Sequence, residues 1–321
     1  MRHVFILNPQ AGKRRDALRL EPAIRAYFAG HAGTYAIRIT EEAGDATRIA
    51  KAACATSTMR DPVRLYACGG DGTLMETVNG IPAYAEAEIA AVACGSANDY
   101  VRTFGGAELF HRVEALIEGR ATAVDAIRCT RGTAGDTLLS LDICAIGMDA
   151  DVAYKMVKYK GWPLVGGQMA YTLAIGDVFC HRFGHALHLS IETAEGTVEQ
   201  EGRFLFALAA SGQYYGGGYR GAPEALPDDG MLDFVLVDVV GRLEALRFLK
   251  HYKRGTHGEL SYVHMWRGRR MTATAAEPVV TTVDGECFRE RQVSFEVLPG
   301  AYRFVLPAGC LSPERPPLER M

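Results

Sequence analysis

The 321-residue chain is predicted to fold as a parallel α/β domain followed by an antiparallel β domain. Strand and helix patterns alternate over residues 1–125, which is typical of a parallel sheet with helices on both faces. Over residues 126–307 the strands follow one another through mostly short connections, which favours an antiparallel sheet or a sandwich. The tail, residues 308–321, is expected to pack back on the first domain. Each of the two domains is long enough to bury a core.

In the first domain, apolar runs predict the strands, and helical spacing of apolar residues predicts the helices between them. The predicted strands lie at residues 3–7, 34–39, 63–68 and 89–93, and the helices at about 15–29, 44–55, 73–79 and 108–118.

In the second domain, apolar segments of strand length dominate and three helical segments interrupt them. The predicted strands lie at residues 138–143, 186–191, 204–208, 232–237, 279–283, 292–297 and 301–306, and the helices at about 148–158, 167–180 and 241–254.

Composition excludes several classes of protein. A hydrophobic content of 48% and a charged content of 23% are normal for a soluble globular protein. The net charge of −3 argues against general nucleic-acid binding. The eight cysteines form no C-x-x-C pair, so we expect reduced core cysteines of a cytoplasmic protein. The apolar run at residues 4–7 is too short for a signal peptide, and no stretch approaches the ~20 apolar residues of a membrane-spanning helix.

The most informative motif is Gly69-Gly70-Asp71-Gly72-Thr73, which stands between a predicted strand and a predicted helix. Glycines let the backbone approach a ligand closely and adopt positive φ angles. The free N–H groups at a helix start attract phosphate. The carboxylate of Asp71 is better suited to a metal, a metal-bound water or a hydroxyl group. The motif indicates phosphoryl transfer from a nucleotide, but the same residues also fit a tight turn with Asp71 as helix N-cap.

Two further loops have the same style. Residues 8–13, Asn-Pro-Gln-Ala-Gly-Lys, follow the first strand, and residues 95–99, Gly-Ser-Ala-Asn-Asp, follow the fourth. The carboxyl ends of parallel strands lie at one edge of the sheet, where open α/β sheets bind ligands. Three such loops therefore predict one ligand site at this edge.

These motifs, together with Glu76, Asn79 and Gly80, resemble the diacylglycerol kinase catalytic-domain family, which includes soluble bacterial diacylglycerol kinases and the sphingosine and ceramide kinases. In the second half, Ala222-Pro223, residues 228–230 and residues 284–286 occur in the expected order. Ala11 and Ser96 stand where Ser and Thr are common in the family. The resemblance implies a nucleotide domain followed by a β-sandwich domain, with the active site in the cleft between them.

The resemblance also implies roles for single residues. Asp71 belongs to a network of acids and waters that holds Mg²⁺ near the γ-phosphate of ATP, and Asp99 and Asp125 match further acids of that network. The alternatives are a helix cap for Asn98-Asp99 and a plain turn for Asp125. Lys13 could equally be a solvated surface lysine. The nucleotide-binding set is Asn8, Pro9, Gly12, Lys13, Thr40, Gly69, Gly70, Asp71, Gly72, Thr73, Glu76, Gly95, Ser96, Asn98, Asp99 and Asp125.

Glu286 is the candidate general base, because transfer to an alcohol needs an acceptor for the hydroxyl proton. By residue type alone it reads as a hairpin-turn glutamate. The resemblance further implies a structural Mg²⁺ held by the Asp229 carboxylate and the backbone carbonyls of Leu226 and Met231. The alternative there is a simple Asp-Gly turn that leads into the next strand.

Residues 247–270 contain seven Lys or Arg and one acid, Glu259, with Tyr252, Tyr262 and Trp266 among them, which suits a negatively charged membrane surface. The alternative is a set of solvated charges. The expected function is an ATP-dependent lipid kinase with a diacylglycerol-like acceptor and a homodimeric assembly. It is expected to be cytoplasmic, with peripheral contact at the inner membrane surface. Kinases of the NAD kinase or phosphofructokinase type and a non-catalytic nucleotide-binding regulator remain alternatives.

Overall fold

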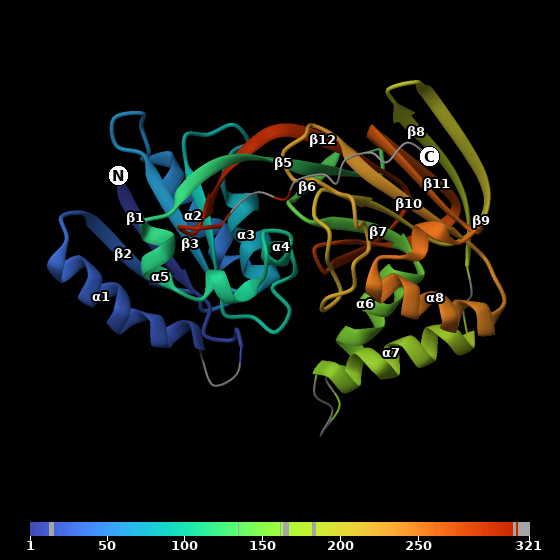
Figure 1. Ribbon diagram of the computed structural model, residues 1–321, viewed down its shortest axis with the longest axis horizontal. Helices are drawn as coiled ribbons and strands as arrows, with labels where there is room; N and C mark the ends of the chain where they lie inside the picture. The colour runs from blue at the N-terminus through green and yellow to red at the C-terminus, as the bar shows by residue number, and fades with distance from the viewer. Residues whose placement is uncertain are drawn as a thin grey trace.

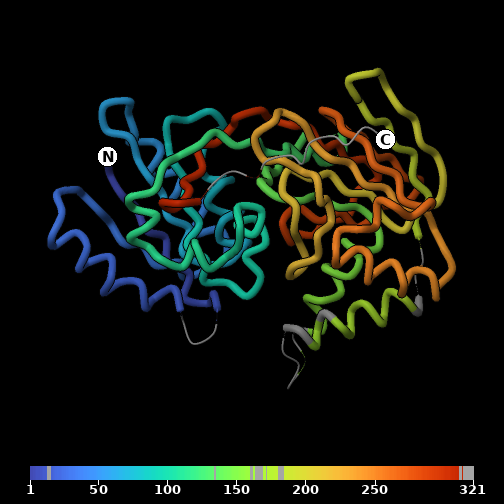
Figure 2. The backbone as a smooth tube through the Cα atoms, in the orientation of Figure 1, coloured from blue at the N-terminus to red at the C-terminus, as the bar shows by residue number. Residues whose placement is uncertain are grey.

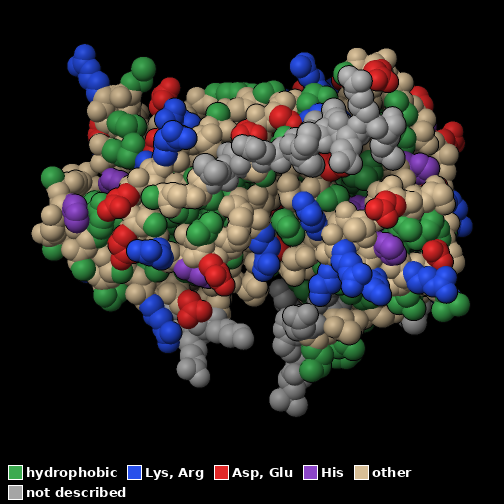
Figure 3. Space-filling model, viewed as in Figure 1, with side chains coloured by type: hydrophobic (Ala, Val, Ile, Leu, Met, Phe, Trp, Pro, Cys, Tyr) green, Lys and Arg blue, Asp and Glu red, His purple; other side chains and the backbone are tan. Residues whose placement is uncertain are grey.

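The computed structural model describes residues 1–12, 16–133, 135–160, 162, 167–181, 184–310 and 313. The chain forms two lobes side by side (Figure 1). The surface is hollowed between the two lobes at the lower edge of this view (Figure 3). No helix among the described residues is long and apolar enough to cross a membrane.

The first lobe is a parallel sheet in the order β4-β3-β1-β2, as the alternation of strands and helices predicts. Because the strand order reverses beside β1 and crossovers are right-handed, α1 covers one face and α2 and α3 the other. Both faces being covered, β3 is buried along its whole length. The elements are β1 (Arg2–Leu7), η1 (Asp16–Leu20), α1 (Glu21–Gly30), β2 (Thr34–Ile39), α2 (Asp45–Ala55), β3 (Val63–Gly69), α3 (Asp71–Gly80), β4 (Glu88–Ala93), α4 (Asp99–Arg102), η2 (Ala107–Phe110) and α5 (Val113–Ile117).

The second lobe consists of antiparallel strands with helices on one side. Alternate side chains, such as Ile146, Leu189, Phe234 and Phe295, fill its interior. A second core cluster lies between the strands and the helices. The elements are β6 (Asp136–Ser140), β7 (Ile143–Gly147), α6 (Met148–Lys160), α7 (Gly167–His181), β8 (His185–Thr193), β9 (Gly196–Ala210), β10 (Leu232–Asp238), α8 (Arg242–Arg254), η3 (His257–Glu259) and β11 (Val263–Val283).

Two long strands, β5 (Arg120–Arg131) and β12 (Glu286–Leu306), run through both lobes, as the trace of the chain shows (Figure 2). The end of β12 pairs with β4 in parallel, at Arg303 and Phe304. The first lobe is therefore completed by residues that the sequence assigns to a second domain ending at residue 307. The period of a strand shows which side chains are buried, but it does not show which sheet the strand joins.

The tail is described only in part. Cys310 Sγ lies 3.0 Å from the carbonyl oxygen of Phe104 in the first lobe. Residues 311, 312 and 314–321 lie outside the described part of the chain.

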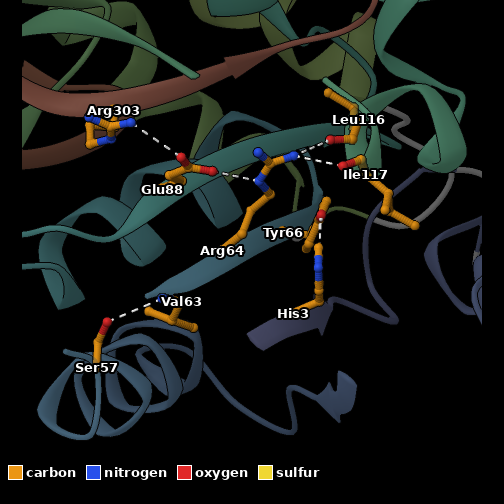
Figure 4. Close-up of polar contacts among 9 residues, drawn as sticks. All are labelled: His3, Ser57, Val63, Arg64, Tyr66, Glu88, Leu116, Ile117 and Arg303. Carbon is orange, nitrogen blue, oxygen red and sulfur yellow. Dashed lines mark hydrogen bonds and ion pairs between the residues drawn. The ribbon is translucent and has the colours of Figure 1, made fainter. Parts of the chain in front are cut away.

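A buried ion pair links the amino ends of β3 and β4 in the first sheet (Figure 4). Arg64 Nε on β3 donates to Glu88 Oε2 on β4 at 2.7 Å, and Arg64 Nη1 donates to the carbonyls of Leu116 and Ile117 at 2.9 and 2.8 Å. Both charged side chains are less than a tenth exposed. Glu88 also accepts a hydrogen bond from Arg303 on β12 at 3.4 Å. One cluster thus joins β3, β4, the end of α5 and the final strand.

Arg64→Met should lower the free energy of unfolding by about 3–5 kcal/mol, because it leaves the Glu88 carboxylate buried without its main partner. Urea unfolding measures this loss. Arg303→Gln is the control, since the Arg303 side chain is half exposed and such a contact contributes at most about 1 kcal/mol. Equal losses in the two variants would contradict the assigned role of Arg64.

Candidate functional site

Three loops meet at the carboxyl edge of the first sheet, beside the point where the strand order reverses. They follow β1, β3 and β4, which are neighbours in the sheet. Asn8, after β1, donates from Nδ2 to Thr73 Oγ1 at 2.9 Å, which joins the first loop to the first turn of α3. In the third loop, Gly95 N donates to Asn98 Oδ1 and Asn98 Nδ2 to Gly95 O, which closes the turn. The predicted meeting of the three loops is confirmed.

The glycines of the central loop serve close packing. None of Gly69, Gly70 and Gly72 has a positive φ, so the expectation of positive φ there is wrong. Instead, a Cβ at Gly95 would overlap the Cα of Gly70, and a Cβ at Gly69 would overlap the Thr73 side chain. A tight contact between two backbones needs residues without side chains. Gly12, in the first loop, does have a positive φ of 71°.

Asp71 begins α3 and holds the third loop through its side chain. Its Oδ1 accepts a hydrogen bond from Asp99 N at 2.8 Å. Burial and, to a smaller extent, the neighbouring charge of Asp99 together raise the pKa of Asp71 to about 6. Burial also raises the pKa of Asp99. The two predicted acids thus lie together, as a pair whose ionisation is costly.

The second lobe reaches the same place. Gly217 N donates to Asp99 Oδ2 at 2.7 Å, and Gln213 N donates to Thr103 Oγ1 at 3.0 Å. Asn79, on α3, donates to the carbonyl of Leu139 at 2.8 Å and accepts from its amide at 2.9 Å. These contacts hold the second lobe against the acid pair.

Two further acids, Asp142 and Asp284, come from the second lobe. Burial raises the pKa of both, that of Asp284 to about 7, and the charge of Asp71 contributes to each shift. Ser140 Oγ donates to Asp284 Oδ1 at 2.7 Å, whereas the buried Asp142 Oδ1 has no hydrogen-bond partner among the described residues. Asp142 is not among the site residues that the sequence predicts. The only feature of the sequence that marks it is its position, as an acid between the two apolar stretches that form β6 and β7.

Glu286 begins β12, directly after a two-residue hairpin turn. Both turn residues, Asp284 and Gly285, have positive φ, of 45° and 95°, which is typical of a type I′ turn. The Glu286 side chain is exposed. The charge of Asp71 contributes to the raised pKa of Asp284, so the turn before Glu286 lies near the first-lobe acids.

Asp125 and Asp229 hold parts of the protein together. Asp125 accepts hydrogen bonds from Gly230 N and Gly300 N, at 2.7 and 2.8 Å, one at each carboxylate oxygen. Asp229 accepts from Met231 N at 3.1 Å and pairs with the guanidinium of Arg267. Asp125 therefore joins the turn at Gly230 to the turn at Gly300. Its membership of a magnesium network stays a prediction.

Other predicted nucleotide contacts lie at varied positions. Thr40 is buried, and its amide donates to Leu7 O at 3.0 Å beside the first loop. Pro9 is half-buried and Ser96 is exposed. Glu76 Oε2 accepts from Ala46 N at 3.3 Å, so this side chain holds the start of α2. Lys13 lies outside the described residues.

Among the described residues, no three His, Cys, Asp or Glu side chains are grouped closely enough to hold a metal ion directly. Within the described part of the chain, Asp142 Oδ1 and Asp99 Oδ1 are buried and accept no hydrogen bond, although Asp99 Oδ1 lies 3.4 Å from Arg102 Nε in an ion pair. Water molecules bound to a cation are donors that could satisfy these oxygens. The acids thus fit a hydrated Mg²⁺ held through water.

Comparisons with known proteins match the whole fold. The sequence profile of the diacylglycerol kinase catalytic domain matches residues 2–129, and that of the YegS C-terminal NAD kinase beta sandwich-like domain matches residues 142–306. A probable lipid kinase YegS-like of Pseudomonas aeruginosa is 30% identical over 296 residues, which is 88% of each chain. The diacylglycerol kinase of Bacillus subtilis is 26% identical over 295 residues, again 88% of each.

A crystal structure of a putative diacylglycerol kinase from Bacillus anthracis superposes with a TM-score of 0.72 at 20% identity, covering 97% of this chain and 98% of that one. The fold is thus the predicted one, an α/β domain followed by a β-sandwich domain. On the profile matches and the 30% identity, the chain belongs to the diacylglycerol kinase catalytic-domain family and is a kinase of the lipid kinase type.

Proposed function

We propose that the protein transfers the γ-phosphoryl group of ATP to the hydroxyl of a diacylglycerol-like lipid. The observation that carries the proposal is the acid pair Asp71–Asp99 at the ligand-binding edge of the first sheet, with Asp284 of the second lobe close enough for the charge of Asp71 to raise its pKa. The relatives named diacylglycerol kinase and probable lipid kinase support a lipid acceptor.

The nucleotide side of the site is built from backbone. The start of α3 presents N–H groups and the positive end of the helix dipole toward the edge where the three loops meet. The packing of Gly70 against Gly95 leaves no side chain at the point where these two loops touch. Asn8 and Asn98 hold the two outer loops rigid around it. This arrangement suits the phosphates of ATP.

The charge at this site needs a counter-ion. Asp71, Asp99, Asp142 and Asp284 are close enough to influence one another's pKa. Asp71 and Asp99 would hold a hydrated Mg²⁺ through its waters. Bound Mg²⁺ neutralises the charge that develops on the transferred phosphoryl group.

On the acceptor side, Glu286 would accept the proton of the lipid hydroxyl as its oxygen bonds to the γ-phosphorus and the bond from that phosphorus to the β–γ bridging oxygen breaks, which releases ADP. The carboxylate stands at the start of a strand, after a turn that Ser140 and Ile143 fasten through Asp284. Its exposure leaves it accessible to a substrate.

The structural magnesium implied for the loop of Leu226, Asp229 and Met231 does not fit this geometry. The only carboxylate of the set contacts the guanidinium of Arg267, whose Nε also lies 3.9 Å from Asp233. The Arg267 guanidinium already supplies a positive charge to this one carboxylate, and it would repel a cation bound directly to it. We assign no role to a metal there.

Assays with ATP, Mg²⁺ and a panel of lipids test the proposed function. A diacylglycerol, a sphingoid base, a ceramide and a water-soluble nucleotide acceptor, NAD, form the panel. We expect phosphate transfer to the diacylglycerol and none to NAD. Phosphorylation of NAD alone would replace the proposal with an NAD kinase activity.

Asp71→Asn should abolish phosphoryl transfer and leave the fold intact, because Asn keeps the acceptor for the Asp99 amide but loses the charge. The folded-state pKa near 6 is above the unfolded value, so the wild type loses stability as pH rises from about 4 through 6. The variant should therefore be more stable than the wild type at pH 8, by at most about 3 kcal/mol, and equal to it below pH 4.

Chemical denaturation at several pH values and turnover assays measure the two effects. Near-wild-type turnover in the folded variant would remove Asp71 from the reaction. If the variant were less stable than the wild type at pH 8, the Asp71 charge would not destabilise the folded state as proposed.

Glu286→Gln should lower kcat by roughly 10²-fold or more, the usual scale for loss of a general base, with little change in the KM for ATP. Steady-state kinetics with varied ATP separate the two. Glu290→Gln is the control, since Glu290 lies on the same strand and pairs with Arg131. If the substitution of Glu286 raised only the KM for ATP, Glu286 would be a nucleotide-binding residue.

Arg267→Gln should make the melting temperature rise with Mg²⁺ in the absence of nucleotide, beyond any rise in the wild type, because a ligand stabilises the state that binds it. Arg267→Gln/Asp229→Asn should lose this extra response, and Arg269→Gln, an exposed neighbour, should match the wild type. If the wild-type melting temperature rose with Mg²⁺ and the single substitution Asp229→Asn abolished that rise, the loop would bind a metal after all.

A further inference from the structure

Exposed apolar side chains are concentrated on three helices of the second lobe. Of the twelve large hydrophobic side chains that are exposed among the described residues, seven lie on α6, α7 and α8 or between α6 and α7. These helices lie together on one side of the lobe (Figure 1). The seven are Tyr154, Val157, Trp162, Met169, Leu173, Leu243 and Leu246.

On α6 and α7 the exposed apolar residues have helical spacing. Tyr154 and Val157 are three residues apart, and Met169 and Leu173 are four apart, so each pair shares a face of its helix. Val157 is 66% exposed and Met169 is 53% exposed. Exposure of such side chains to water is unfavourable in free energy, and a contiguous apolar surface is typical of an interaction site.

The third helix adds positive charge to apolar side chains. The face of α8 with Ala245, Phe248 and Tyr252 is buried. Its outer residues include Leu243, 77% exposed, and Leu246, 54% exposed. The helix carries five Lys or Arg and one Glu, and Lys and Arg side chains gather over it (Figure 3). A basic amphipathic helix of this kind is typical of helices that lie on anionic membranes.

Two of these helices, α6 and α8, are linked to the loop that contacts the acid pair. Asp149, in the first turn of α6, accepts hydrogen bonds from Tyr215 and, at 3.4 Å, from Tyr252 of α8. Tyr215 belongs to the loop in which Gly217 donates to Asp99. The start of α6, the end of α8 and the loop that contacts Asp99 are therefore joined at one carboxyl group.

We propose that the outer faces of α6, α7 and α8 dock the protein on an anionic lipid bilayer, a proposal that rests on the proposed function because a lipid acceptor resides in the bilayer. We call this surface the helical docking face and define it by Val157, Met169, Leu243 and Leu246, with Arg247 and Lys250. The apolar side chains enter the interfacial layer, and the basic side chains contact lipid phosphates.

Charge favours a bilayer over a second copy of the chain. In a two-fold symmetric dimer the same patch meets itself, so the basic outer surface of α8 would face its own copy. Like charges placed opposite one another are unfavourable. An anionic bilayer instead complements both the charge and the apolar groups.

The helical docking face includes only part of the basic stretch 247–270, whose contact with a membrane stays a prediction. The structure divides that stretch between α8 and β11, and Arg267 on β11 pairs with Asp229. Only the part on α8 stands beside the exposed apolar side chains.

Co-sedimentation with vesicles tests the proposal, using phosphatidylcholine alone or with one fifth phosphatidylserine. The apolar variant is Leu243→Ser/Leu246→Ser, and the charge variant is Arg247→Gln/Lys250→Gln/Arg254→Gln. All five side chains are exposed, so the fold should survive. The controls are Met59→Ser, an 84% exposed methionine of the first lobe, and Arg269→Gln/Arg270→Gln on β11.

The wild type should bind the anionic vesicles, and salt should weaken that binding. Each test variant should reduce binding by at least tenfold, and the controls should match the wild type. Both test variants should keep full activity on a short-chain, water-soluble diacylglycerol. Unchanged vesicle binding in both test variants would overturn the proposal. So would a wild-type dimer in sedimentation velocity that the apolar variant dissociates without any loss of vesicle binding.

The two proposals can fail separately. Wild-type protein that binds vesicles through this face but phosphorylates no lipid would overturn the proposed function alone. Protein that phosphorylates short-chain diacylglycerol while both variants bind vesicles normally would overturn the docking face alone.

Discussion

The arrangement of this protein depends on hydrogen bonds that run from side chains of the first lobe to the backbone of the second. Asp99 accepts from Gly217 N, and Asn79 both donates to and accepts from Leu139. Each bond joins a side chain fixed by the first sheet to a turn fixed by the second. Backbone amides are placed with little freedom, so a few such bonds set the distance between the nucleotide loops and the hairpin of Glu286. The groups proposed to react come from both lobes, and these hydrogen bonds between the lobes set the distance between them.

The contact region between the two lobes contains several buried acidic side chains. Asp71, Asp99, Asp142 and Asp284 all have raised pKa values, first of all because burial disfavours the charged carboxylate. A protein selected for stability alone would not place four acids there. Such costs are found where a site must attract a cation and bind polar substrates. The contacts from Gly217 to Asp99 and from Ser140 to Asp284 offset part of the cost.

The sequence predicts the first lobe well, because its signals are local. An apolar run followed by glycine and a helical pattern predicts both the strand and the position of Asp71 at its edge. The structure adds what depends on distant partners. Arg267 contacts Asp229 across 38 positions, and nothing near either residue indicates the pairing. Asp142 gains its meaning only where the lobes meet. The glycines 69 and 70 could be identified, but their reason, contact with another loop, could not be read from their own neighbours.

The crossing of β12 has a consequence for how the chain is made. A chain that leaves the ribosome folds from its N-terminus, and a complete first domain would normally fold while the rest is still being synthesised. Here the residues that pair with β4 and β5 follow the whole second lobe in the sequence. Until then Tyr100, Phe104 and Phe110 lack Phe304, the ring against which they pack. The first lobe therefore reaches its final packing only after the residues of the second lobe have been synthesised.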